Sequence, residues 1–178
     1  MIFKHCPDCG ENLDSKEIGD EGFVPFCSPC QKPLFSFSYP CVLCVITNDK
    51  NEIALIKQSY VSEHWVGVAG YVKQGETIEN CAKREVEEET GLTVTEVDYL
   101  KSYYLEKEDL LMFGFICKTQ TVAFSTSKEV EQARWFPVGE ALNSLKPGSI
   151  IQTLVKDYMH DRKYEEEAIL RCHGTNLD

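Results

Sequence analysis

Hydrophobic and polar positions after residue 40 follow the pattern of short strands separated by turns. The apolar runs 41–47 and 52–58 flank the turn-forming residues 48–51, which predicts a β-hairpin. Further apolar runs at 92–105, 110–119 and 133–138 predict additional strands. The pattern changes near residues 36–40, so we expect a separate module before that point.

Two segments have helical spacing instead. Residues 77–90 are mostly polar with a regular apolar stripe, and Thr77 and Gly91 suit the N-terminal and C-terminal caps. A second helix is expected from Ser149 to beyond Asp161, because its apolar residues recur at intervals of three and four. One early and one late helix among strands predict an α+β layered sandwich.

The first 36 residues contain two C-x-x-C pairs, Cys6/Cys9 and Cys27/Cys30. Two such pairs can place four thiolates tetrahedrally around one zinc ion. The alternative is two disulfides or incidental thiols, and His5 could compete as a ligand. Four protein ligands leave no open position, so the spacing favours a structural site. We therefore expect a zinc ribbon over residues 1–36, a segment too short to fold on its own core.

A third pair, Cys41 and Cys44, lies inside an unbroken apolar run. Side chains alternate between the two faces of a strand, so residues three apart cannot share a metal ion. We expect both thiols to pack in the core instead.

Composition and charge narrow the possible functions. Hydrophobic residues make up 43% of the chain, which is enough for a real core. The net charge of −11 disfavours binding to duplex nucleic acid or to an anionic membrane surface. No apolar run approaches the roughly 18 residues of a membrane span, and the first residues lack the apolar region of a secretory signal. We expect a cytoplasmic protein.

The helix expected at 77–90 carries three glutamates on one side. Glu85, Glu88 and Glu89 stand at i, i+3 and i+4, beside the apolar stripe. Carboxylates packed together in a partly buried place repel each other unless a cation neutralises them, and Mg²⁺ or Mn²⁺ is suited to oxygen ligands. A solvated acidic face is an equally good interpretation of this spacing alone.

The wider string GYVKQGETIENCAKREVEEETGL resembles the Nudix box at every defining position. These positions are Gly70, Glu76, Arg84, Glu85, Val86, Glu88, Glu89, Gly91 and Leu92. A nine-position pattern is highly specific. The resemblance implies a Nudix hydrolase with an α/β/α sandwich, which cleaves a nucleoside diphosphate linked to another moiety with the help of a divalent metal.

The resemblance also implies roles for individual residues. Glu85, Glu88 and Glu89 would bind the metal, and one of them would help to deprotonate the attacking water. Arg84 would pair with a glutamate and orient it. Gly70 and Gly75 would shape the loop before the helix, Glu76 would brace that loop, and Gly91 would end the helix.

A zinc ribbon followed by a Nudix domain at residues 37–178 is similar to the layout of the bacterial NADH pyrophosphatase group. That resemblance implies a homodimer and a further acidic ligand, best matched by Glu129 with Glu131 as the alternative. Tyr39 and Tyr71 are candidates for stacking on a base or a nicotinamide ring, although packing explains them equally well. The group's string SQPWPFP is replaced by SYYLEKE at residues 102–108, so we do not expect selectivity for NADH.

We therefore expect a pyrophosphohydrolase dependent on Mg²⁺ or Mn²⁺. It would convert an NAD(H)-like dinucleotide or a nucleoside diphosphate sugar into a nucleoside monophosphate. Two alternatives remain open. One is removal of a cap, including an NAD cap, from the 5′ end of RNA, which contains the same bond. The other is a module that senses a nucleotide without cleaving it and contacts a partner through the zinc ribbon.

Overall fold

The computed structural model describes residues 3–58 and 63–173, with side chains described as far as residue 162. The chain divides into two compact units. The first contains the chain up to Tyr39 together with Leu105–Leu110, and the second contains Pro40–Tyr104 and the chain from Leu111 onward.

The first unit is built on a small antiparallel sheet. Its strands are β1 (Asp14–Glu17), β2 (Phe23–Cys27) and β3 (Lys32–Pro33), in that spatial order, with the short helix η1 (Gly19–Glu21) between β1 and β2. A second short helix, η2 (Glu106–Glu108), also belongs to this unit. The backbone N–H of Tyr39 donates to the carbonyl of Asp109 at 2.8 Å, which joins the two segments of the unit.

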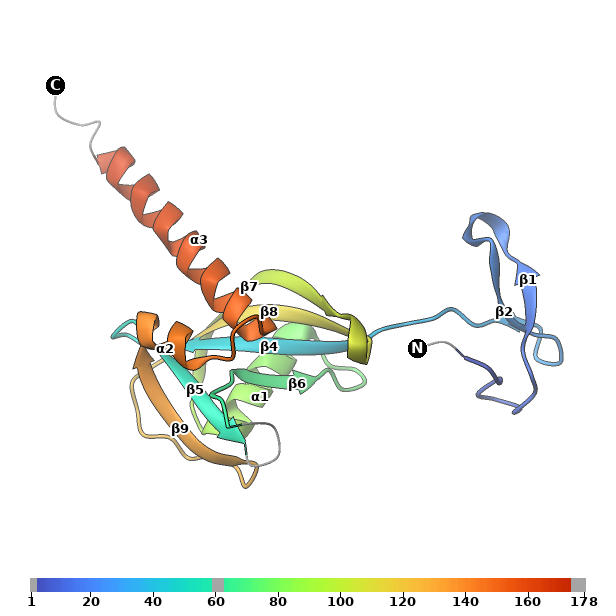
Figure 1. Ribbon diagram of the computed structural model, residues 1–178, viewed down its shortest axis with the longest axis horizontal. Helices are drawn as coiled ribbons and strands as arrows, with labels where there is room; N and C mark the ends of the chain where they lie inside the picture. Colours follow the sequence, from blue (N-terminus) through green and yellow to red (C-terminus); the bar gives the residue numbers. More distant parts are fainter. Residues whose placement is uncertain (1–2, 59–62, 174–178) are drawn as a thin grey trace. The chain divides into compact units, whose positions relative to one another are not determined.

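The second unit contains a six-stranded sheet in the order β7-β8-β4-β5-β9, and β6 pairs with β4 (Figure 1). Its strands are β4 (Tyr39–Thr47), β5 (Glu52–Gln58), β6 (Val68–Tyr71), β7 (Val94–Leu105), β8 (Leu110–Thr119) and β9 (Val130–Pro137). Three helices accompany it: α1 (Ile78–Thr90), α2 (Val138–Ser144) and α3 (Ile150–His173). The hairpin and strands expected from the apolar runs are confirmed.

The sheet separates α1 from α3. Phe115 and Cys117 of β8 are buried in a core cluster that also contains Ala82 and Val86 of α1. Gly114, which directly precedes Phe115 in sequence, faces Leu154 of α3, whose side chain leaves no room for a Cβ. Because neighbouring residues of a strand point to opposite faces, the two helices cover opposite faces. The second unit is therefore an α/β/α sandwich, which agrees with the α+β layered sandwich expected from the sequence.

Helix α1 begins and ends where its capping residues predict. The Thr77 hydroxyl accepts a hydrogen bond from the Asn80 N–H at 3.3 Å, which satisfies one of the first amides of the helix. Gly91 adopts φ 69°, a left-handed conformation that glycine enters at little cost, and its N–H donates to the Glu87 carbonyl. These two caps fix the length of the helix and therefore the placement of its glutamates.

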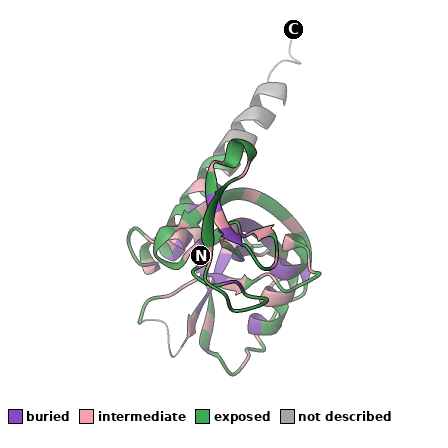
Figure 2. Cartoon of the chain, turned by 90° about the vertical axis from the view of Figure 1, so that its right-hand side faces the viewer, coloured by how far each residue is buried: buried purple, intermediate pink, exposed green. Residues whose placement is uncertain are grey.

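The core is concentrated in the strands of the six-stranded sheet (Figure 2), where seven consecutive residues of β4 are buried. Cys41 and Cys44 are both buried, and the predicted packing role is confirmed. Cys81 and Cys117 are fully buried on the α1 side. No helix in the described part of the chain is long and apolar enough to cross a membrane.

Candidate metal centres

The three glutamates of α1 lie at different depths. Glu89 is buried, with 7% of its surface exposed, and the Glu85 side chain is 14% exposed. Glu88, at the outer side of the group, is 54% exposed. The exposure of the three carboxylates thus decreases from Glu88 at the solvent side to Glu89 at the edge of the core, as helical spacing predicts for residues that border an apolar stripe.

Arg84 holds the carboxylates around it. Its guanidinium binds both oxygens of Glu76, at 2.7 and 2.8 Å, in a bidentate pair. The same group donates to Glu85 at 2.6 Å, to Glu88 at 3.1 Å, and to the carbonyl of Tyr71 at 3.2 Å. Arg84 therefore joins the end of β6, the loop before α1, and two α1 glutamates in one network.

This network stabilises the ionised form of Glu76. The hydrogen bonds from Arg84 lower the pKa of Glu76 from 4.5 to about 2, and the backbone N–H of Lys73 adds a further donor. The carboxylate of Glu76 in turn raises the pKa of Arg84. Through these contacts Glu76 connects the backbone of Lys73, in the loop before α1, with Arg84 of the helix.

The Glu76 pKa makes a testable contribution to acid stability. A carboxyl whose pKa falls on folding stabilises the protein above its unfolded pKa, and that stability is lost as the pH falls toward the folded pKa. We expect Glu76→Gln to lower the urea midpoint at pH 6, with a difference from wild type that shrinks from pH 5 to pH 3. Urea titrations over this range measure it, with exposed Glu87→Gln as the control. A difference that stays constant with pH would contradict the assigned cause.

Gly70 leaves room for the Glu85 carboxylate. A Cβ at residue 70 would overlap the Cγ, Cδ and Oε1 atoms of Glu85. The Glu85 side chain cannot simply swing away without giving up its 2.6 Å hydrogen bond to Arg84. A side chain at residue 70 would therefore displace a candidate metal ligand.

Gly70→Ala is accordingly expected to reduce hydrolytic activity about 100-fold, because misplacing a reacting group by about 1 Å costs that much. The chain offers a matched control in Gly139→Ala, since a Cβ there meets nothing within 4 Å. Initial rates of both variants measure the effect. Equal rates would show that the position of Glu85 does not matter.

Among the three glutamates of α1, Glu89 has the least favourable surroundings for a negative charge. Its Oε1 accepts a hydrogen bond from Gln58 Nε2 at 3.3 Å, whereas its buried Oε2 has no partner in the described part of the chain. Burial raises the pKa of Glu89 to about 8, and the neighbouring charges of Glu85, Glu129 and Glu88 add to the shift.

An orphaned carboxylate oxygen among other carboxylates fits a hard divalent cation. The three glutamates of α1 nevertheless do not form a closed set of donor atoms. Within the described residues, only the cysteine cluster brings three or more His, Cys, Asp or Glu ligand atoms within 4.8 Å of one another. Arg84 instead holds Glu85 and Glu88.

The other residues predicted for the catalytic site lie in or beside β9, at the end of β6 and in the first unit. Glu129 is exposed just before β9, near enough to Glu89 to raise its pKa, and Glu131 is exposed within β9. Tyr71, at the end of β6, is 58% exposed, and Tyr39 in the first unit is 37% exposed with its ring against Phe37. The motif did not identify Gln58, which lies 31 residues from Glu89 in sequence.

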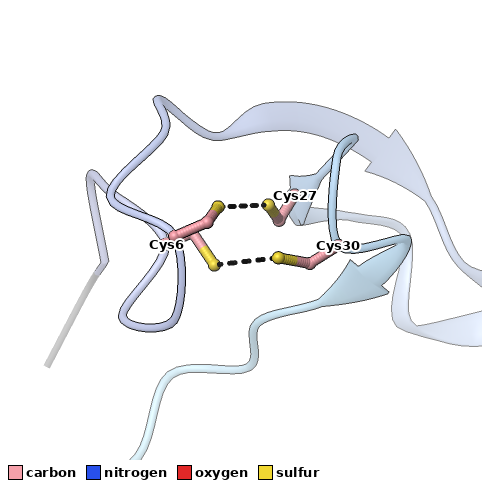
Figure 3. A group of neighbouring side chains, drawn as sticks. Cys6, Cys27 and Cys30 are labelled. Carbon is pink, nitrogen blue, oxygen red and sulfur yellow. Dashed lines mark hydrogen bonds between the residues drawn. The ribbon is translucent and has the colours of Figure 1, made fainter.

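The four predicted cysteines of the first unit form a compact cluster, and Figure 3 labels three of them, Cys6, Cys27 and Cys30. All four sulfur atoms lie within 4.8 Å of one another. Sγ of Cys6 is 3.9 Å from that of Cys30, and Sγ of Cys9 is 3.5 Å from that of Cys27. A tetrahedral zinc ion with Zn–S bonds of about 2.3 Å requires sulfur separations of about 3.8 Å. His5 is not part of the cluster.

The crowded thiols differ in how easily they ionise without a cation. Burial raises the pKa of Cys27, whereas in Cys6 burial is outweighed by backbone hydrogen bonds from Cys9 and Asp8, which lower its pKa to about 7. Hydrogen bonds with Cys9 and Cys27, together with burial, raise the pKa of Cys30 to about 12. A bound zinc ion would reverse this balance, because coordination favours the thiolate. Both the geometry and the donor type therefore fit zinc.

A model of the NUDIX domain family matches residues 38–154 of the chain. Among curated proteins, the chain is 26% identical over 164 residues to the NAD-capped RNA hydrolase NudC of Vibrio atlanticus (strain LGP32), an alignment that covers 89% of the chain and 58% of that protein. It is 30% identical over 157 residues to human NAD-capped RNA hydrolase NUDT12, with coverage of 82% and 33%. The chain thus spans only part of these relatives.

Two solved structures have the same fold. A NUDIX hydrolase from Nitrosomonas europaea superposes with a TM-score of 0.70 at 23% identity, covering 91% of this chain and 93% of that one. The NUDIX domain of Shewanella oneidensis NrtR, crystallised with ADP ribose, superposes with a TM-score of 0.61 at 14% identity, covering 71% and 90%. At these identities, the likeness concerns the fold alone.

Proposed function

Because the chain belongs to the NUDIX domain family, we propose that it is a pyrophosphohydrolase dependent on Mg²⁺ or Mn²⁺. Its substrate would be a nucleoside diphosphate derivative, and its product a nucleoside monophosphate. The proposal depends most on one observation, the buried Oε2 of Glu89, which has no hydrogen-bond partner among the residues that the structure describes. A pure binding module has no need to keep a desolvated carboxylate beside three others.

In this proposal, Glu85, Glu88 and Glu89 hold the cation and Glu129 assists. A bound divalent cation would neutralise phosphate oxygens and lower the pKa of its bound water. Arg84 fixes the orientation of Glu85 and Glu88, and Gly70 leaves room for Glu85. Magnesium keeps several water ligands, so the cation does not require all the carboxylates to converge on it.

The names of the relatives support a proposed substrate class, and the string at residues 102–108 limits its expected selectivity. NudC and NUDT12 are named as NAD-capped RNA hydrolases, which favours a dinucleotide of the NAD type, either free or at an RNA 5′ end. The second candidate function is therefore removal of an NAD cap. Residues 102–108 lack the proline-rich string, so strong selectivity for NADH is not expected. Tyr71 and Tyr39 are the candidates for stacking on a base or nicotinamide ring.

The four cysteines are proposed to bind one structural zinc ion. The geometry of the sulfur atoms and the small core of the first unit support this assignment. Among the described residues of that unit, the buried apolar side chains are few: Cys6, Cys27 and Leu34 form one cluster, and Val24 and Phe26 are also buried. A module of this size needs a metal to be stable. We place the boundary between ribbon and hydrolase domain at residues 36–37.

A substrate panel tests the proposed function. The protein is incubated with NAD(H), nucleotide sugars, nucleoside triphosphates and NAD-capped RNA, each with and without Mn²⁺, and the products are identified by mass spectrometry. The expected result is cation-dependent release of a nucleoside monophosphate, or of 5′-monophosphate RNA from the capped substrate. Binding of these compounds without cleavage of any would overturn the proposal and favour a sensor module.

A further inference from the structure

Gln58 occupies a core-facing position where the strand pattern calls for an apolar residue. It is the last residue of β5, and Ala54 and Ile56, at the two preceding alternate positions, are buried in the α1-side core. Alternate residues of a strand share a face, so the regular series leads from these side chains to Gln58. A polar residue that breaks such a series marks a position where function competes with packing.

An irregularity in the sheet supports the direction of this side chain. Lys57 of β5 pairs with Gln132 of β9, whereas Gln58 pairs with Val130, so Glu131 is passed over in the register. Bulges of this kind redirect neighbouring side chains and are common beside active sites. Val130 is itself buried in the α1-side core, and residues directly paired across strands share a face. Gln58 therefore points toward α1.

The Gln58 amide binds one oxygen of Glu89, the most deeply buried of the described carboxylates. Its Nε2 donates to Oε1 of Glu89 at 3.3 Å, while Oε2, also buried, has no partner within the described residues. Gln58 thus holds Oε1 of Glu89 in place, whereas Oε2 is left available to bind a ligand. An amide can hold a carboxylate in this way without neutralising it, because it donates a hydrogen bond and carries no charge.

We propose that Gln58 is a positioning residue that orients Glu89 so that Oε2 faces the divalent cation. This inference rests on the proposed function, in which Glu89 is a metal ligand. Partners that hold a metal ligand in place usually affect metal affinity about 10- to 100-fold. Gln58 is expected to act in that range, through Glu89 and without contacting the substrate.

Gln58→Met tests the role, because methionine has a similar length but cannot donate a hydrogen bond. We expect the affinity for Mn²⁺ alone, measured by electron paramagnetic resonance without nucleotide, to fall about 10- to 100-fold. Raising the Mn²⁺ concentration should restore part of the hydrolysis rate, whereas the KM for nucleotide at saturating Mn²⁺ should stay within about twofold. A residue that only packs would produce neither the Mn²⁺ shift nor the rescue.

Gln132→Met is the matched control, since this exposed glutamine lies on the neighbouring strand but pairs with Lys57. It should leave the Mn²⁺ affinity unchanged. Gln58→Asn keeps the amide but shortens the side chain, so it should weaken Mn²⁺ binding in the same direction and provides a second variant if Gln58→Met does not fold. Urea midpoints identify the folded variants.

The outcomes separate the two proposals. A folded Gln58 variant that binds Mn²⁺ as tightly as wild type, in a protein that hydrolyses its substrate, would overturn the positioning role alone. A wild-type protein that neither binds Mn²⁺ nor cleaves any diphosphate would overturn the proposed function itself.

Discussion

Glu89→Gln is expected to lower kcat by about 10²- to 10⁴-fold, the range typical of losing a group that assists proton transfer. The substitution keeps the shape of the side chain but removes the charge that would hold the cation. The Gln58 amide would then face a neutral group at Glu89 Oε1. Steady-state rates in Mn²⁺, on the substrate identified by the panel, measure the loss.

Although Glu89→Gln should lose activity, it should not lose stability. The wild-type carboxylate is desolvated and surrounded by the charges of Glu85, Glu129 and Glu88. A neutral amide avoids both costs, so the metal-free variant should unfold at a urea concentration no lower than wild type at pH 8. Glu87→Gln, at an exposed position of the same helix, is the control and should retain full activity. Loss of activity accompanied by unfolding would show that Glu89 is structural.

Cys27→Ser is expected to abolish zinc binding and to unfold the first unit. Cys27 is fully buried and its sulfur lies 3.5 Å from that of Cys9. Structural zinc sites contribute about 10–16 kcal/mol to folding, far more than a few buried apolar residues can replace. Zinc content should fall from one ion per chain to nearly none, and amide exchange in β1 and β2 should become fast.

Cys41→Ala separates this effect from general loss of a thiol. Cys41 is also buried, but it lies in β4 and outside the cysteine cluster. The variant should retain one zinc ion and slow exchange in β1 and β2. If Cys27→Ser kept its zinc, or if wild-type protein contained none, the zinc ribbon assignment would be wrong.

Local sequence signals predicted the elements that local interactions determine. Thr77 and Gly91 cap α1 through contacts with residues three and four positions away, so the sequence alone was enough to set the ends of this helix. The strand β6 was not assigned in advance, because it is four residues long and includes a glycine. The helix α2 was also missed, since it has seven residues and no side-chain cap.

The candidate sites also contain some residues that local sequence signals predict and others that only tertiary contacts bring together. Two C-x-x-C pairs predicted the cysteine cluster because each pair is local and the donor type is distinctive. The box placed Gly70, Arg84 and Glu85 within one short stretch, and the structure brings these three together. Gln58 could not be predicted, since its contact with Glu89 depends on how β5 pairs with β9. The inclusion of Leu105–Leu110 in the first unit likewise depends on tertiary contacts.

A crystal structure of the protein soaked in Mn²⁺ and a non-cleavable dinucleotide tests the central claim most directly. Anomalous scattering identifies the metal without reference to activity. We expect a manganese peak bonded to Oε2 of Glu89 and to at least one oxygen of Glu85 or Glu88, with diphosphate oxygens completing the shell. A well-ordered crystal with the dinucleotide bound and no manganese on these glutamates would contradict the account.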